Sequence, residues 1–360
     1  MNNFMKSGYA FACTIFLLCA CETDSISPEN ENKNQSSITE NPEKSSKRAR
    51  SSASIGIVGS SADVNTSTSG GTVLMGGGPD VDEAIQWMIN RSGGGDFVVI
   101  RASGTDAYNS YIYGLGSVNS VETLLIDSRV LANDAGVEAT IRNAEALFIA
   151  GGDQYDYVSY WKDTKVEGAI NYLRNSKKVP VGGTSAGCAI QGEAYFDAAN
   201  GTVYSDEALD DPYNQYMSLQ TGNFLDIPYL ENTITDTHYN DPDRRGRHLT
   251  FLARMNEDWG VNAKGIGVDE ETAVCIDASG KASVFGYGYA FFLRQNGLGP
   301  ERCEPNRSLD WYRGRQAVKV YRVRGNSSGS NYLWLTNWTS GAGGSWQYFY
   351  ADRGRFRFSN

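Results

Sequence analysis

One serine of this sequence lies in a setting that suits nucleophilic catalysis. Ser185 follows a short apolar run and is enclosed by small residues in Gly183-Thr184-Ser185-Ala186-Gly187. A sharp turn from a strand into a helix needs Gly or Ala around the serine, because larger side chains would collide where the backbone reverses. The turn exposes the hydroxyl at a helix N-terminus, where free N–H groups favour developing negative charge. The pattern therefore predicts a serine nucleophile.

Only two histidines occur in the chain, so the search for a general base is short. A serine hydroxyl is a poor nucleophile until a base removes its proton, and that base is usually histidine. His248 lies in an amphipathic stretch at residues 247–254, where a structural role is more common. We therefore predict that His238 is the base.

The order of these residues along the chain narrows the class of hydrolase. Gly-x-Ser-x-Gly also occurs in α/β-hydrolases, which place the acid between the serine and a histidine near the C-terminus. Here both histidines follow soon after Ser185, and residues 249–360 contain none. The carboxylate that orients the base must come from the short stretch between serine and histidine, or from beyond the histidine.

Five motifs, in this order, resemble those of cyanophycinase and the related aspartyl dipeptidase (peptidase E). They are Ala150-Gly151-Gly152-Asp153-Gln154, the serine motif, Asp236-Thr237-His238-Tyr239, Arg244-Arg245-Gly246-Arg247 and the run at 265–273. The resemblance covers roughly residues 70–290. It implies a class I glutamine-amidotransferase-like α/β fold, a three-layer sandwich with a mostly parallel central sheet, in which serine replaces the usual cysteine nucleophile.

The same resemblance implies roles for the residues that match. Ser185 would be the nucleophile and His238 the general base, with Glu270 orienting the imidazole; Asp269 and Glu271 are the alternatives for the acid. Such a carboxylate fixes the histidine tautomer and stabilises its cation. The oxyanion hole would be formed by backbone N–H groups, most simply those of Gly152 and Ala186.

The resemblance implies that the substrate contains a β-linked Asp-Arg unit. In this family, binding of that unit is attributed to residues around these motifs. An arginine can fork onto a substrate carboxylate, and an aspartate can meet a guanidinium, although helix-surface pairing is an equal alternative for each arginine. Thr237 stands where the family has Gln, and residues 240–243 look like an insertion, so polymer, dipeptide and other isopeptide substrates stay open. The matching or near-matching residues are Asp153, Gln154, Asp236, Arg244, Arg245 and Arg247.

The elements that must position these residues alternate between strands and helices from residue 55 onward. Continuous apolar runs alternating with amphipathic stretches predict a parallel sheet covered on both faces, with sites beyond the strand carboxyl ends. The glycine triplet at 76–78 lacks a phosphate-binding signature, so we expect a tight turn there. Strands are expected at 72–75, 97–100, 123–126, 146–150 and 179–181, and helices at 80–89, 135–143, 166–174 and 186–195.

The last part of the chain has a different pattern. Residues 318–323 and 332–335 read as β-strands, and the tail is rich in aromatic residues. We predict a β-rich extension over 291–360 that packs on a catalytic domain at 55–290. A glycan-binding platform is the alternative for the aromatic tail.

The N-terminus predicts export. Its apolar stretch, 9–20, is too short to span a membrane and reads as part of a signal peptide over 1–20. Leu18-Cys19-Ala20-Cys21 resembles the lipobox of bacterial lipoproteins, which implies cleavage before Cys21 and lipidation of its thiol; a plain secretory peptide is the alternative. Residues 21–54 are polar and predict a disordered tether. We thus expect a protein anchored by lipid to the bacterial cell envelope, facing the periplasm or the surroundings.

Composition excludes some classes of partner. The net charge of −10 argues against nucleic acid. The cysteines that would remain after processing, Cys188, Cys275 and Cys303, lack zinc-site spacing, so no metal site is expected. No nucleotide cofactor is expected either, because the glycine triplet lacks a phosphate-binding signature. Cys188 reads as a core residue, a disulfide between Cys275 and Cys303 is conceivable, and a homodimer stays open.

Together these features predict an exported serine peptidase that cleaves peptide or isopeptide bonds at aspartyl residues through an acyl-enzyme. An esterase using the same serine is one alternative. A non-catalytic lipoprotein that binds peptide or glycan is the other.

Overall fold

A computed structural model of the chain describes residues 51–360. Its first sheet has ten strands in the order β1-β4-β3-β5-β6-β2-β11-β12-β15-β16. Neighbouring strands are parallel from β4 to β2, and the others pair antiparallel. The parallel part comprises β4 (Ser120–Leu125), β3 (Asp96–Arg101), β5 (Ala146–Ile149), β6 (Pro180–Thr184) and β2 (Gly71–Met75). This confirms the predicted α/β class with a parallel-rich sheet.

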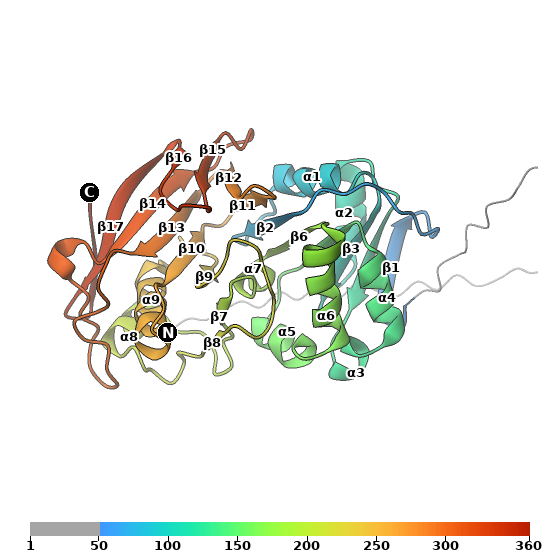
Figure 1. Ribbon diagram of the computed structural model, residues 1–360. Coiled ribbons are helices and arrows are strands. Elements are labelled where there is room, and N and C mark those ends of the chain that lie inside the picture. The colour runs from blue at the N-terminus through green and yellow to red at the C-terminus, as the bar shows by residue number, and fades with distance from the viewer. Residues whose placement is uncertain (1–50) are drawn as a thin grey trace, which may run out of the picture. The chain divides into compact units, whose positions relative to one another are not determined.

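Helices cover both faces of this parallel region (Figure 1). Successive strand residues point to opposite faces, and along β2 Val73 and Met75 join one hydrophobic cluster while Leu74 joins another. The first cluster includes side chains of α1 (Asp82–Arg91) and α2 (Ala107–Leu115). The second includes side chains of α4 (Ala135–Asn143), α5 (Gln154–Trp161) and α6 (Lys165–Tyr172).

Antiparallel strands extend the sheet at both ends. At one edge, β1 (Ser54–Gly59) pairs with β4. Ala53 is buried just before it, so the ordered fold begins earlier than the predicted tether boundary at residue 54. The predicted signal peptide, the predicted lipidation site Cys21 and most of the predicted tether lie outside the described residues. At the other edge stand β11 (Thr272–Asp277), β12 (Lys281–Gly286), β15 (Asn331–Trp334) and β16 (Gly341–Ala342).

A second sheet of eight strands carries the histidine motif. Its order is β18-β17-β14-β13-β10-β9-β7-β8, and β9 (Thr233–Asp236) runs parallel to β10 (Lys264–Val268). The long helix α9 (Arg245–Trp259) and the shorter α8 (Ser205–Asp210) share a hydrophobic core with this sheet. The remaining strands are β18 (Arg355–Ser359), β17 (Gly344–Asp352), β14 (Val318–Arg324), β13 (Tyr289–Gln295), β7 (Ala194–Phe196) and β8 (Leu219–Thr221).

The C-terminal segment is rich in β-strands, as predicted, but these strands belong to the two sheets of the fold and do not form an added layer. The predicted boundary between residues 290 and 291 falls inside β13, which pairs with both β10 and β14. Further along the chain, β15 returns to the first sheet and pairs with β12. The aromatic residues Trp338 and Phe349 are buried in the cores of the fold, which agrees with packing and not with a glycan platform.

The helix predicted over 186–195 is much shorter. It ends after one turn as α7 (Ala186–Ala189), and Tyr195 lies in β7. The buried Gln191 side chain donates to the carbonyls of Val73 and Gly187, which holds the chain out of the helix and redirects it into the second sheet. The other short helical segments are α3 (Arg129–Ala132), the π-helical η1 (Leu173–Lys177) and η2 (Arg313–Arg315).

The three cysteines of the fold are free and buried. Cys275 and Cys303 belong to different hydrophobic clusters, so the conceivable disulfide between them is not formed. Cys188 is a core residue, as predicted.

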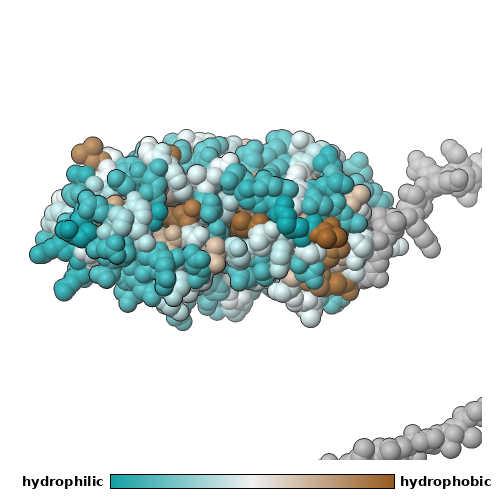
Figure 2. Space-filling view, turned by 90° about the horizontal axis from the view of Figure 1, so that it is seen from below, coloured by the Kyte–Doolittle hydropathy of each residue, from teal (hydrophilic) through white to brown (hydrophobic). Residues whose placement is uncertain are grey.

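Figure 2 shows a face on which hydrophilic residues predominate and apolar residues form small separate groups. Within 51–360, no helix has the length and apolar content needed to cross a membrane.

Candidate active site

Ser185 occupies the sharp turn that its neighbours predict. It joins the end of β6 to α7 with φ 51° and ψ −119°, a conformation that costs energy for a residue with a side chain. Small neighbours are required here, because a Cβ on Gly183 would lie 2.4 Å from the Gly187 carbonyl oxygen. A Cβ on Gly187 would lie 2.2 Å from the Ile149 oxygen. The turn thus holds the hydroxyl at the carboxyl end of the parallel strands.

The structure brings Ser185, His238 and Glu270 together in a hydrogen-bonded row. Oγ of Ser185 lies 2.7 Å from Nε2 of His238, and Nδ1 of the same ring lies 2.6 Å from Oε1 of Glu270. His238 follows β9 and Glu270 follows β10, and these neighbouring parallel strands end at the same edge of the second sheet. The serine comes from the first sheet, so the row forms where the two sheets meet.

The glycine triplet at residues 76–78, after β2, packs against His238 and Glu270 and helps to hold them in position. The backbone N–H of His238 donates to the Gly76 carbonyl over 2.7 Å, and the N–H of Glu271 donates to Gly77 over 3.1 Å. A Cβ on Gly77, where φ is 97°, would lie 2.4 Å from Cε1 of the His238 ring. The tight turn expected from the sequence is therefore a turn that leaves room for the imidazole.

Asn240 also supports the row, and sequence reasoning missed it. Its Oδ1 accepts a hydrogen bond of 3.0 Å from the backbone N–H of Glu270. It lies in the segment that looked like an insertion, two residues after His238. Neither Asn240 nor Gly77 has a sequence signal for this role, because each acts through a partner that is distant in the chain.

Two backbone N–H groups near Ser185 are free to donate hydrogen bonds to a developing negative charge. The N–H of Ser185 itself donates to the Met75 carbonyl over 3.1 Å and is occupied. In the described part of the chain the N–H groups of Gly152 and Ala186 make no hydrogen bond, and both residues line the pocket in front of the serine. They match the predicted oxyanion pair in position.

That pocket has a volume of 390 Å³ and contains most of the predicted substrate residues. Ser185 and His238 lie on its wall together with Thr202 and Thr235. The predicted substrate residues that line it are Asp153, Gln154, Asp236, Arg244 and Arg247. Arg245 is not among its lining residues.

Asp236 and Arg247, which both line the pocket, form an ion pair with each other. Two hydrogen bonds of 2.9 and 2.5 Å join the guanidinium to the two carboxylate oxygens, and the side chains are only 3% and 4% exposed. Burial alone would raise the pKa of Asp236, but the charge and hydrogen bonds of Arg247, together with other nearby positive groups such as Arg244, lower that pKa. Asp236 therefore has little capacity left for a substrate guanidinium.

Arg244 is the cation in this pocket that has no carboxylate partner. Its Nη1 donates to the Thr237 carbonyl over 3.0 Å, while its buried Nε has no hydrogen-bond partner. Among residues 51–360 no Asp or Glu forms an ion pair with it. Burial, together with the like charge of Arg247, lowers the pKa of Arg244, so this guanidinium would gain from an anionic group of a ligand.

Arg245 points elsewhere, although it follows Arg244 directly. It forms an ion pair with Asp243 and lines a neighbouring hollow beside Tyr289 and Arg322. The expectation that it contacts substrate in the serine pocket is not supported by this placement, because consecutive residues at a helix start point in different directions.

Asp153 and Gln154 lie at the start of α5, facing the serine pocket. One carboxylate oxygen of Asp153 accepts from the backbone N–H of Tyr155 over 2.9 Å and caps the helix. The side chain is exposed, so its second oxygen is open to a ligand. Neither residue touches the catalytic row, which suits a role at the pocket rim.

The second histidine is a core residue, as expected. His248 is fully buried in α9, and its Nδ1 lies 3.1 Å from the Tyr239 hydroxyl. Burial lowers its pKa to about 4, so the ring is neutral at physiological pH. It does not contact Ser185, and this agrees with the choice of His238.

The two alternative acids also lie apart from the histidine row. Asp269 accepts a hydrogen bond of 3.0 Å from the Tyr289 backbone and faces the hollow that contains Arg245. Burial raises its pKa to about 6. Glu271 faces a different hollow, beside Asp82 and Tyr287. Glu270 is the acid bonded to His238.

This arrangement allows the Ser185 hydroxyl to transfer its proton to the imidazole of His238, which the carboxylate of Glu270 holds in place. Two free N–H groups and an unpaired guanidinium face the same pocket. Across residues 51–360, no cluster of three or more His, Cys, Asp or Glu side chains is arranged to hold a metal ion.

The sequence is similar to that of known peptidases. The family model described as Peptidase family S51 matches residues 72–284. The chain is 28% identical over 171 residues to a cyanophycinase from Synechococcus elongatus, covering 48% of each protein. It is 27% identical over 168 residues to a cyanophycinase from Nostoc sp., covering 47% of this chain and 51% of the relative. The chain thus spans about half the length of these curated relatives.

A solved structure gives a weaker similarity. A peptidase from an acI-B1 Actinobacterium superimposes with a TM-score of 0.46 and 17% identity, over 62% of this chain and 90% of that one.

Proposed function

Because the chain belongs to peptidase family S51, we propose that it is a serine hydrolase that cleaves an amide bond at an aspartyl residue. The observation that carries this proposal is the pair of hydrogen bonds that links Ser185, His238 and Glu270 beside a pocket with an unpaired arginine. No metal or nucleotide takes part in the chemistry we propose.

The reaction begins with attack of the Ser185 hydroxyl on the substrate carbonyl. His238 Nε2 accepts the hydroxyl proton as the Oγ–carbon bond forms, and Glu270 stabilises the resulting imidazolium. The N–H groups of Gly152 and Ala186 donate to the oxyanion. His238 then gives its proton to the leaving amine, and the acyl-enzyme remains.

Water completes the cycle by the reverse route. His238 removes a proton from the water molecule while its oxygen attacks the acyl carbonyl. The tetrahedral intermediate collapses, the Ser185 oxygen leaves, and the imidazolium returns a proton to it. The strained backbone at Ser185 keeps its hydroxyl exposed for both steps.

An acidic residue on the acyl side of the scissile bond suits this pocket. Arg244 lacks a carboxylate partner, and a substrate carboxylate would supply one. Asp153 and Gln154, which line the same pocket, offer acceptors to a basic or neutral residue on the leaving side. The matched relatives are cyanophycinases, which agrees with an aspartyl substrate such as β-Asp-Arg.

An esterase that uses the same serine is the second candidate. A substrate panel separates the two: β-Asp-Arg dipeptide and polymer, α-linked Asp-X dipeptides, and a simple aryl ester. We expect kcat/KM for an aspartyl amide to exceed that for a matched amide in which Ala replaces Asp. Equal values for the two amides, with fast turnover of the ester, would overturn the aspartyl specificity.

We further propose that the protein is exported and held at the cell envelope by lipid on Cys21. The lipobox-like Leu18-Cys19-Ala20-Cys21 and the polar stretch after it support this proposal. Metabolic labelling with a fatty-acid analogue in a bacterial host tests it. Label that persists in Cys21→Ser would contradict it.

A further inference from the structure

A second hollow lies at the opposite end of the parallel strands from Ser185. It has a volume of 290 Å³ and is bordered by the first residues of β2, by Arg174 of η1 and by Lys178, which directly follows η1. The loop residues Pro228 and Tyr229, together with Ile276 and Ala278, form its other walls. A strand of five residues is about 16 Å long, so this hollow is well separated from the serine pocket.

Arg174 is a buried cation in this hollow without a carboxylate partner. Its side chain is 4% exposed, and within the described residues no Asp or Glu forms an ion pair with it. Nη2 donates to Gln191 over 2.5 Å and Nη1 to the Thr72 hydroxyl over 3.3 Å, but the buried Nε has no partner. An arginine buried without a counter-ion is costly, and burial lowers its pKa to about 9.

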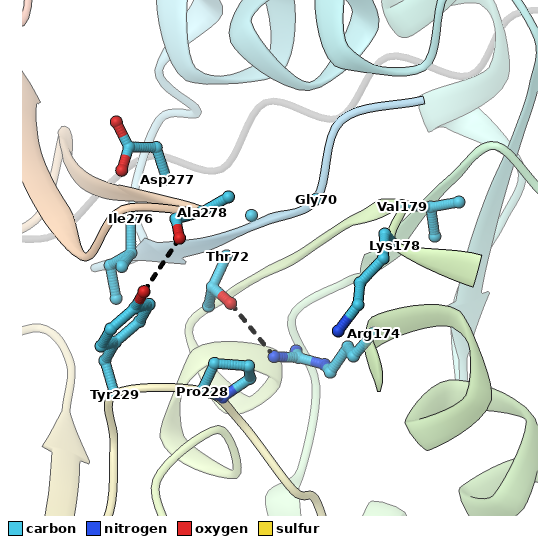
Figure 3. A pocket seen from close by; sticks show the side chains of 11 residues that line it. Gly70, Thr72, Arg174, Lys178, Val179, Pro228, Tyr229, Ile276, Asp277 and Ala278 are labelled. Carbon is cyan, nitrogen blue, oxygen red and sulfur yellow. Dashed lines mark hydrogen bonds between the residues drawn. The ribbon is translucent and has the colours of Figure 1, made fainter. Parts of the chain in front are cut away.

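A second cation faces the same opening. Figure 3 shows the amino group of Lys178 and the guanidinium of Arg174 directed into one space, with Pro228 and Tyr229 on its other side. Lys178 makes no ion pair within residues 51–360. The Asp277 carboxylate is directed away from the two cations in the same view, and it accepts from Ser279 and the backbone of Lys281. Two positive groups therefore converge with no anion between them.

The carboxylate of Asp226 acts on Arg174 but does not form an ion pair with it. Asp226 raises the pKa of Arg174 only against the larger effect of burial, and its carboxylate accepts from Asn175 over 3.2 Å. Gln191 holds the guanidinium in place, because its own amide donates to the carbonyls of Val73 and Gly187. The cation is thus fixed in advance in the position that an anion would use.

We propose that this hollow is a second binding site, and that its ligand is a small organic carboxylate. The carboxylate would accept from Arg174 and Lys178, and the apolar walls would contact its carbon chain. These walls favour an organic acid over inorganic phosphate, which has no apolar part. The site requires neither Ser185 nor His238, so it is independent of the hydrolase proposal.

Calorimetric titration with succinate, at constant ionic strength set with chloride, tests the proposal. We expect saturable binding that weakens about tenfold or more in Lys178→Gln and in Arg174→Gln. Lys165→Gln is the matched control, because it also removes one positive charge, at an ion pair with Glu138 that is outside the hollow. That variant should bind as the parent protein does. Arg174→Lys, which keeps the charge, should bind better than Arg174→Gln and covers the case in which the latter does not fold.

Two further arms identify the site and the ligand class. The serine pocket also offers a free arginine, so binding must persist in Arg244→Gln; loss of binding there would overturn the assignment to this hollow. Inorganic phosphate is titrated in parallel, and phosphate binding without succinate binding would overturn the organic class. Equal weakening in all variants, or no saturable binding of succinate, would also contradict the proposal.

Discussion

The imidazole of His238 lies against the Cα atom of Gly77, so closely that a methyl group there would stand 2.4 Å from its Cε1 atom. A glycine after β2 thereby fixes where the histidine ring can stand, although the two residues are far apart in the sequence. The ring in turn reaches Ser185 from one side and Glu270 from the other. The position of the His238 ring therefore depends on the space beside Gly77 as well as on its hydrogen bonds.

Gly77→Ala should therefore reduce catalysis much more than a glycine substitution usually does. The new methyl group must displace the ring from Ser185, and we expect kcat to fall about 100-fold or more. Steady-state kinetics on an aspartyl amide measures this effect. The control is Gly297→Ala, because Gly297 has a similar φ of 89° but no atom within 4 Å of the added methyl group. Equal losses in the two variants would mean that backbone strain, and not the ring, is responsible.

Asp236→Asn should act mainly on stability. The substitution leaves the buried Arg247 without its counter-ion, and we expect the free energy of unfolding to fall by about 3–5 kcal/mol. Asp243→Asn breaks a more exposed pair with Arg245 and should lower it by about 1 kcal/mol or less. Urea unfolding of both variants provides the comparison. A stable Asp236→Asn protein with weakened substrate binding would instead restore the substrate role expected from the sequence.

Arg244→Gln should impair turnover of substrates that carry a carboxylate. Loss of a charge-assisted hydrogen bond is expected to lower kcat/KM for an aspartyl amide about 10- to 100-fold, with little effect on the matched alanyl amide. Arg245→Gln is a natural control, since that side chain faces the neighbouring hollow. If Arg245→Gln gave the larger loss, the assignment of the substrate arginine would be wrong.

Features of the fold that depend on neighbouring residues were predictable from the sequence. Local chemistry was predictable: the small residues around Ser185 require a sharp turn, and the helix at 135–143 has the predicted bounds. Tertiary partners were not. The helix expected over 186–195 stops at Ala189, and the buried amide of Gln191 bonds to the carbonyl of Val73, which lies 118 residues away in the sequence.

The same limit applies to the substrate residues. The motif Arg244-Arg245-Gly246-Arg247 gives no sign that its three arginines have three different environments. The structure pairs Arg247 with a buried carboxylate, turns Arg245 toward Asp243 and leaves Arg244 unpaired. The predicted boundary at residue 290 missed β13 for a similar reason, since strand pairing across the sheet decides where a domain ends.

The free energy of unfolding should change between pH 4 and 6 because Asp269 titrates in this range. Burial raises its pKa to about 6 in the folded protein, so the folded state holds this proton more tightly than the unfolded state does. Its contribution to stability is present below pH 4 and is lost as the pH rises through 6. Asp269→Asn lacks this loss, and above pH 6 it should be more stable than the parent by about 1–3 kcal/mol.

Urea unfolding of both proteins across this pH range measures the difference. His248 has an opposite effect, because its pKa is lowered and its contribution is lost as the pH falls toward 4. That residue is present in both proteins, so its effect cancels in the difference curve. A difference that is constant with pH would contradict the raised pKa of Asp269.

The central claim is that the Ser185 oxygen forms the acyl bond with the help of His238. The most direct measurement is labelling of the intact protein by a fluorophosphonate, followed by mass spectrometry of the modified peptide. We expect one adduct on Ser185, none in Ser185→Ala, and labelling of His238→Gln slowed about 1000-fold or more, with loss of aspartyl-amide hydrolysis in step. Hydrolysis that survives unchanged in Ser185→Ala would contradict the account.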